Sequence, residues 1–160
     1  MAPTIRPAEA RDIDCLLAIY RPADDLAAEL LPGFFKPAAG YERPRTEIEA
    51  QLADADALVL VAEDARGVIG LLMAALRESP PWAGFVRRCY VEVVDLAVDA
   101  AARREGVGRL LMDAAEAWAR ERGADSVDLT VVEGNAPALA LYENLGYRMR
   151  SHRMWKRLDR

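Results

Sequence analysis

A glycine-containing turn in the second half of the chain has the residue types that bind a phosphate group. It follows an apolar run at residues 91–98 that is typical of a strand, and it precedes a helical pattern at residues 109–122 that ends at Gly123. A turn between a strand and a helix directs backbone N–H groups at an anion, and the helix dipole adds about half a positive charge there. Glycines in the turn have no Cβ, so an anion can approach the main chain. The predicted pyrophosphate site comprises Arg103, Arg104, Glu105, Gly106, Val107, Gly108 and Arg109.

Two common phosphate-binding motifs do not fit this turn. A Walker A loop requires Lys and then Ser or Thr after its last glycine, whereas Arg109 and Leu110 follow Gly108. The dinucleotide-binding fingerprint requires a third glycine, and Leu111 occupies that position. A nucleotide-binding protein is therefore disfavoured.

Two other motifs are present, in order. Arg103-x-x-Gly106-x-Gly108 fits the pattern [QR]-x-x-G-x-[GA], and residues 135–147 fit N-x-x-A-x-x-[LF]-Y-x-x-x-G-[FY]. In both motifs and in their spacing the chain resembles the GNAT superfamily of N-acetyltransferases, which bind acetyl-CoA. The resemblance implies an α/β (α+β) fold with a mixed, partly antiparallel sheet of about six to seven strands and helices on both faces. The second motif is matched at Asn135, Ala138, Leu141, Tyr142, Gly146 and Tyr147.

The resemblance also implies roles at the end of the strand and on the later helix. In the family the central strand splays from its neighbour, and its freed backbone groups at Leu96, Ala97 and Val98 would pair with pantetheine and the thioester oxygen. A backbone donor to an oxyanion contributes about 3 kcal/mol in other enzymes. Asn135 and Tyr142 are seven residues apart, so on a helix they lie on nearly the same face, roughly 10 Å apart along its axis. Asn135 would meet the distal arm of the coenzyme, and Tyr142 would meet its sulfur as the general acid.

Glu92 is the predicted general base. An amine like that of lysine has a pKa of about 10.4, so presenting it neutral at pH 7 costs roughly 4–5 kcal/mol. A carboxylate within the apolar residues 91–94 could have a raised pKa and accept that proton. The alternative is that Glu92 is simply a charge on the solvent side of a strand. The alternation of a strand predicts that Asp95 points to the opposite face from Glu92, which makes it the poorer candidate.

The remaining pattern predicts the elements that position these residues. Asp12 is expected to cap a helix that ends near Tyr20, with a second helical piece at residues 23–31 and a capping box from Thr46 to Glu49. Alternation and turn residues predict strands at residues 4–6, 57–62, 68–76, 88–98, 126–132 and 147–157. A helix capped by Asn135 is expected to end at Gly146.

Bulk composition excludes several classes of function. The chain has 160 residues, and we expect a single N-acetyltransferase domain over residues 1–160. A net charge of −5 disfavours nonspecific nucleic-acid binding. Two cysteines and one histidine exclude a disulfide scaffold and a Cys/His zinc site. With no signal peptide and no apolar run of about 18 residues, we expect a cytoplasmic protein with no metal and no membrane partner.

The sequence leaves the acceptor open. We expect transfer of the acetyl group of acetyl-CoA to a primary amine of a small molecule or protein, by direct attack in a ternary complex. The alternative is a non-catalytic acyl-CoA-binding or sensor module on the same fold. A homodimer formed through the sheet edge is one alternative, and residues 147–157 leave little room for the two strands with which many members of the family end. Aromatic residues in two loops either form the amine pocket or cover the core; they are Phe34, Phe35, Tyr41, Trp82 and Phe85.

Overall fold

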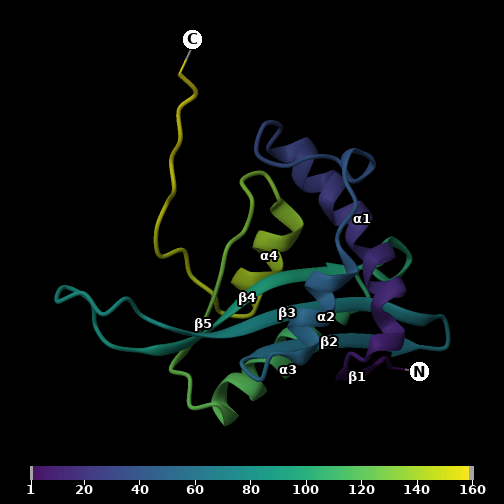
Figure 1. Cartoon of the computed structure of the whole chain (residues 1–160), viewed down its shortest axis with the longest axis horizontal. Helices are drawn as coiled ribbons and strands as arrows, with labels where there is room; N and C mark the ends of the chain where they lie inside the picture. The colour runs from purple at the N-terminus through teal and green to yellow at the C-terminus, as the bar shows by residue number, and fades with distance from the viewer. Residues whose placement is uncertain (1, 159–160) are drawn as a thin grey trace.

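The structure, a computed structural model, describes residues 2–158 and is built on one five-stranded sheet. The strands lie in chain order, with antiparallel pairing through the first four and parallel pairing between the last two (Figure 1). The strands are β1 (Thr4–Pro7), β2 (Ala57–Asp64), β3 (Gly67–Glu78), β4 (Cys89–Val98) and β5 (Ser126–Leu129).

Helices cover both faces of the sheet, and each face has its own apolar core. The helices α1 (Ile13–Leu30) and α2 (Arg45–Ala53) pack on one face, over a core that includes Leu16 and Met73. The helices α3 (Val107–Glu121) and α4 (Ala136–Asn144) pack on the other, over Leu72 and Leu111. The mixed fold with helices on both faces is therefore confirmed, and in the described part no helix is long and apolar enough to cross a bilayer.

The strand count was overestimated, because the predicted strand at residues 147–157 does not form. That segment is extended and leaves the body of the molecule without joining the sheet (Figure 1). After Tyr147, whose N–H donates to the carbonyl oxygen of Tyr142, its contacts include those of two side chains: Arg150 lies 2.8 Å from Asp128, and the Trp155 ring packs 4.6 Å from that of Phe34. A segment becomes a strand only beside a partner, and the edge strand β5 has just four residues.

A β-bulge in β4 determines which side chains face which core. Val93 pairs with Ala74 and Asp95 with Met73, so Val94 has no partner on β3. Glu92 pairs with Ala75 and therefore lies on the same sheet face as Asp95, the face covered by α1 and α2. The prediction that these two carboxylates point to opposite faces was wrong, because a bulge inserts one residue into the alternation.

Two helix starts also differ from prediction. The two helical pieces around Pro22 form one helix, α1, whose first half is buried through Ile13, Leu16, Ile19 and Tyr20. Asp12 is the N-cap residue of α1 as predicted, but its side chain makes no capping hydrogen bond; its carboxylate instead accepts hydrogen bonds from Arg6, at 2.7 and 2.9 Å, and from the backbone N–H of Glu9. The capping box at Thr46 does not form either, because α2 already begins at Arg45.

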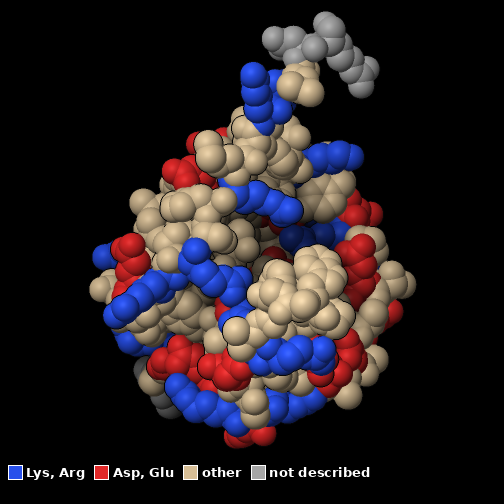
Figure 2. Space-filling model, turned by 90° about the vertical axis from the view of Figure 1, so that its left-hand side faces the viewer, with Lys and Arg blue, Asp and Glu red and all other residues tan. Residues whose placement is uncertain are grey.

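Surface charge is mixed on the face seen in Figure 2. Acidic and basic side chains are interspersed over it, and a hollow opens near its centre. With no single sign of charge covering this face, binding of a charged ligand depends on the groups local to each cavity.

Candidate functional site

The turn before α3 has the geometry that a phosphate site requires. Gly106 is the N-cap of α3 with φ of 84°, and Arg104 also has a positive φ, 69°. Val107, Gly108 and Arg109 form the first turn of the helix, where the backbone N–H groups have no hydrogen-bond acceptor within the helix. The helix begins two residues earlier than predicted, so both glycines of the motif belong to its N-terminus.

An arginine from the β2–β3 hairpin holds this turn in place. Arg66 donates to the carbonyl oxygen of Ala101 at 3.2 Å and to Glu105 Oε2 at 2.7 Å, and it also pairs with Asp64. The guanidinium lowers the pKa of Glu105 by hydrogen bonding. Glu105, predicted as part of the pyrophosphate site, is thus directed at the hairpin. The sequence around Arg66 predicts only a turn at residues 64–67. No local pattern reveals that Arg66 contacts a residue 39 positions away.

The β4–β5 ladder ends early. It covers Tyr90 to Val93 on β4, whereas β4 continues to Val98. Within residues 2–158, the backbone edge that carries Leu96, Ala97 and Val98 therefore has no ladder partner on the β5 side. Arg103 Nε donates to the carbonyl oxygen of Val98 at 3.2 Å, which ties the strand end to the turn.

The two motifs meet where this strand end approaches α3 and α4. A Cβ on Gly108 would lie 3.1 Å from Leu141 Cδ2 and 4.0 Å from Leu96 Cδ2. Asn135 caps α4 by accepting a hydrogen bond from the backbone N–H of Ala138 at 3.3 Å. Tyr142, on the same helix, is nine-tenths buried beside the core under α3. Burial raises the pKa of its phenol, so the hydroxyl keeps its proton at neutral and mildly alkaline pH.

The two carboxylates of β4 have different surroundings. Glu92 has a side chain that is 44% exposed, and Arg77 Nε lies 3.1 Å from its Oε2. Asp95 is partly buried, and this burial raises the pKa of its carboxyl against the opposing effect of Arg43. Tyr20 Oη lies 3.2 Å from Asp95 Oδ2.

Two cavities open on the α1 and α2 side. The first, about 370 Å³, reaches the bulge; its lining includes Tyr20, Arg43, Glu47, Met73, Arg77, Val94 and Asp95. The second, about 320 Å³, is lined by Asp24, Phe34, Phe35, Lys36 and Tyr41. Arg43 and Asp24 join their walls through two hydrogen bonds of 3.0 and 2.6 Å.

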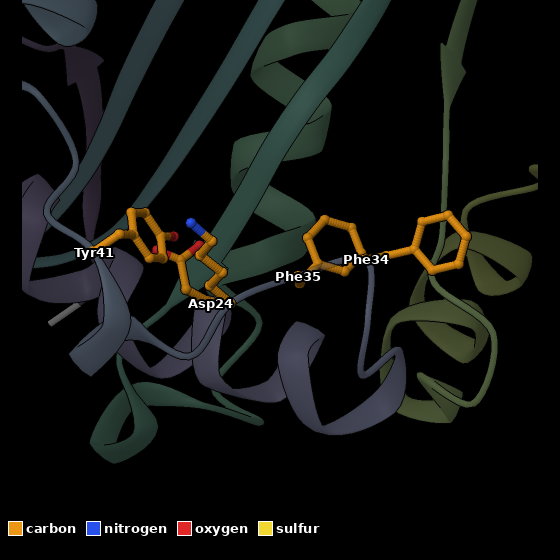
Figure 3. Close-up of a pocket in the computed structure, with 5 residues that line it drawn as sticks. Asp24, Phe34, Phe35 and Tyr41 are labelled. Atoms are coloured by element: carbon orange, nitrogen blue, oxygen red, sulfur yellow. The ribbon is translucent and has the colours of Figure 1, made fainter. Parts of the chain in front are cut away.

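The aromatic side chains predicted in two loops separate into two groups. In Figure 3 the Phe35 ring lies between Phe34 and the Asp24 side chain, with Tyr41 on the far side of Asp24. Trp82 and Phe85 pack against each other, with ring centroids 5.4 Å apart, in the β3–β4 loop. The structure thus assigns three of the five to a cavity. In the part of the chain from residue 2 to 158, no group of three or more His, Cys, Asp or Glu side chains is arranged to hold a metal ion.

Known proteins are similar to this sequence over much of its length. The profile of the Acetyltransferase (GNAT) family matches residues 23–147. Streptothricin acetyltransferase from Streptomyces lavendulae is 35% identical over 98 residues, which are 61% of this chain and 48% of that protein. Mycothiol acetyltransferase from Salinispora tropica is 38% identical over 95 residues, 59% of this chain and 29% of that protein. The matched part thus spans about half or less of these curated relatives.

Solved structures share the fold over the whole chain. A point variant of the BH1408 protein from Bacillus halodurans has a TM-score of 0.91 at 24% identity, with 97% of this chain and 99% of that chain covered. An aminoglycoside antibiotic 6′-N-acetyltransferase from Acinetobacter haemolyticus has a TM-score of 0.70 at 22% identity, with 98% and 99% covered. With the family profile matching most of its length, this chain belongs to the GNAT family of acetyltransferases.

Proposed function

We propose that this acetyltransferase transfers the acetyl group of acetyl-CoA to a primary amine by direct attack in a ternary complex. The observation that carries the proposal is the convergence of three elements at Gly108, where the first turn of α3 meets Leu96 of β4 and Leu141 of α4. Both sequence motifs and the unpaired end of β4 are thereby brought to one place. Antibiotic acetyltransferases among the similar proteins favour a small-molecule amine as acceptor.

The coenzyme would lie along this convergence. Its pyrophosphate would accept hydrogen bonds from the N–H groups of residues 107–109, with Arg103 and Arg109 adding positive charge. Its pantetheine arm would pair with the free edge of β4 at residues 96–98. One of those N–H groups would then donate to the oxygen of the thioester as it becomes an oxyanion.

Proton transfers complete the reaction. Tyr142 would donate a proton to the departing thiolate, for which a protonated phenol is required. A carboxylate on β4 would receive the proton of the acceptor. Glu92 is the residue predicted for this role from the sequence, and it faces the α1 and α2 side with its carboxylate half exposed.

The direct test is thermal stabilisation by the coenzyme. A ligand that binds only the folded state stabilises it by mass action, by about 2.7 kcal/mol at 100 times its Kd. We expect acetyl-CoA to raise the Tm clearly, and ATP and NAD at equal concentration to raise it much less. Equal shifts from all three, measured by calorimetry, would mean that the turn is a generic anion site.

Arg66 should affect coenzyme affinity without touching the coenzyme. Replacing Arg66 with Ala removes the bonds to Ala101 and Glu105, so the turn loses its fixed position and Glu105 is left as an unpaired negative charge near the pyrophosphate. We expect a Kd for acetyl-CoA several-fold higher by isothermal titration.

Arg11→Ala serves as a matched control, because Arg11 also makes an exposed ion pair, with Glu9, but far from the turn in sequence. An Arg66→Ala protein with the affinity of the Arg11→Ala protein would show that the hairpin does not position the turn.

A further inference from the structure

Asp95 occupies a position that the sequence pattern did not reveal. The bulge at Val94 turns its side chain to the α1 and α2 side, within the part of β4 beyond Val93 that, in the described chain, has no ladder partner on the β5 side. It lines the 370 Å³ cavity together with Val94 itself. A group in that cavity would therefore approach β4 where the proposed thioester lies.

We propose, building on the proposed function, that this cavity binds a cationic primary amine that lacks a carboxylate, and that Asp95 rather than Glu92 binds its ammonium group and accepts its proton. Glu92 belongs to the same sheet face but is half exposed and already paired with Arg77. Asp95 is partly buried, its Oδ2 lies 3.2 Å from the Tyr20 hydroxyl, and among the described residues no ion pair is found for it.

The charges around the cavity favour a cation. The charged groups around Asp95 come from four elements and a loop: Asp24 from α1, Arg43 from the loop before α2, Glu47 from α2, Arg77 from β3 and Glu92 from β4. Both guanidinium groups are matched by carboxylates, Arg43 by Asp24 and Arg77 by Glu92. Asp95 and Glu47 are left as two negative charges without a paired guanidinium. An acceptor with its own carboxylate would add repulsion in the cavity, whereas an amine without one would supply the missing positive charge.

Tyr20 positions the carboxylate. Its hydroxyl lies 3.2 Å from Asp95 Oδ2 and 3.0 Å from Met73 Sδ, and the carboxylate is the stronger acceptor of its hydrogen. Burial and the nearby Asp95 raise the pKa of Tyr20, so it remains a donor. The Arg43 guanidinium lies over the same ring, 4.0 Å from its centroid, which helps to hold the ring in place.

The proton balance of the reaction is complete with these groups. The ammonium gives one proton to the Asp95 carboxylate and becomes a neutral amine. The amine nitrogen forms a bond to the acetyl carbon, the carbon–sulfur bond breaks, and the nitrogen loses a second proton as the amide forms. The second proton reaches the thiolate through the Tyr142 hydroxyl, which gives up its own proton and regains this one, and Asp95 returns the first proton to solvent, so that one proton is released overall. Burial raises the pKa of Asp95, which makes it a better proton acceptor than an exposed aspartate.

The test compares Asp95→Asn with Glu92→Gln, a matched loss of one carboxylate on the same sheet face. We would measure kcat/KM for phenethylamine from pH 6 to 9.5 at saturating acetyl-CoA, together with the Kd for acetyl-CoA. At pH 7 we expect Asp95→Asn to lower kcat/KM for phenethylamine roughly 100-fold, a typical contribution of a general base. The loss should shrink towards pH 9.5, because the neutral fraction of an amine with a pKa of about 10.4 rises about tenfold per pH unit.

Glu92→Gln should keep the pH dependence of the wild type, with a KM for the amine raised only a few-fold, because it frees the Arg77 guanidinium in the cavity wall. A Glu92→Gln loss that equals or exceeds that of Asp95→Asn, or an Asp95→Asn protein with the wild-type profile, would overturn the assignment.

Tyr20→Phe, which keeps the ring, should lower kcat by a smaller factor and leave the coenzyme Kd unchanged. It guards against the possibility that Asp95→Asn fails to fold. A Tyr20→Phe protein with wild-type kcat would contradict the positioning of Asp95 by Tyr20.

The charge preference has its own measurement on the wild-type protein. We expect kcat/KM for phenethylamine and 1,4-diaminobutane to exceed that for glycine by tenfold or more. Equal values would contradict the cationic site. If no amine is acetylated although acetyl-CoA binds, the proposed function fails; if amines are acetylated but the variants behave alike, only the inference about Asp95 fails.

Discussion

Replacing Gly108 with Asp should abolish acetyl-CoA binding while the protein stays folded. The new carboxylate would lie at the first turn of α3, where the pyrophosphate is expected, and juxtaposed like charges cost several kcal/mol. We expect the Kd to rise at least about 100-fold, which corresponds to about 2.8 kcal/mol. The φ of Gly108 lies outside the left-handed region, and an acidic residue near a helix N-terminus is favourable, so the helix can accept Asp.

Gly108→Ala separates charge from bulk in this experiment. Its Cβ would lie 3.1 Å from Leu141 Cδ2, a tight contact that the end of a flexible side chain can relieve. We expect a much smaller loss of affinity than with Asp, at an unchanged Tm of the free protein. A folded Gly108→Asp protein that binds acetyl-CoA normally would contradict the placement of the pyrophosphate at this turn.

Replacing Tyr142 with Phe should lower kcat by roughly 10- to 100-fold with little change in coenzyme affinity, a typical loss for a general acid. The effect stays moderate because a thiol has a pKa near 8.5, so its thiolate leaves with only modest help. Since burial raises the pKa of Tyr142, the phenol of the wild-type protein should remain protonated up to pH 9.5. Ionisation of Tyr142 should therefore cause no loss of activity over this range.

Tyr147→Phe is the matched control for that substitution. Its ring centroid lies 6.0 Å from that of Tyr142, but its hydroxyl donates to Glu116 at 3.1 Å. Pre-steady-state kinetics with a saturating amine should show the loss for Tyr142→Phe alone. Equal effects of both substitutions would mean that Tyr142 is a packing residue of the core.

Local patterns predicted the part of the site that lies within single elements. The turn at Gly106, the cap at Asn135 and the stop at Gly146 each depend on a few neighbouring residues, and each is found where the pattern places it. The helices on both faces of the sheet follow from the same kind of periodicity.

The rest of the site depends on contacts that no local pattern contains. The bulge at Val94 arises from the register between β3 and β4, and it reverses the expected orientation of Asp95 relative to Glu92. Arg66 reaches Glu105 across 39 positions. The last predicted strand, residues 147–157, has strand-like residues but no partner, so composition alone overestimated the sheet.

Acetyl transfer itself is the measurement that tests the account most directly. Wild-type protein would be mixed with acetyl-CoA and phenethylamine, and free coenzyme thiol and acetylated amine would be followed together. We predict that both products appear in equal amounts, and that Gly108→Asp produces neither. Coenzyme that binds but releases no thiol with phenethylamine, 1,4-diaminobutane or glycine would contradict catalysis and indicate an acyl-CoA-binding module on the same fold.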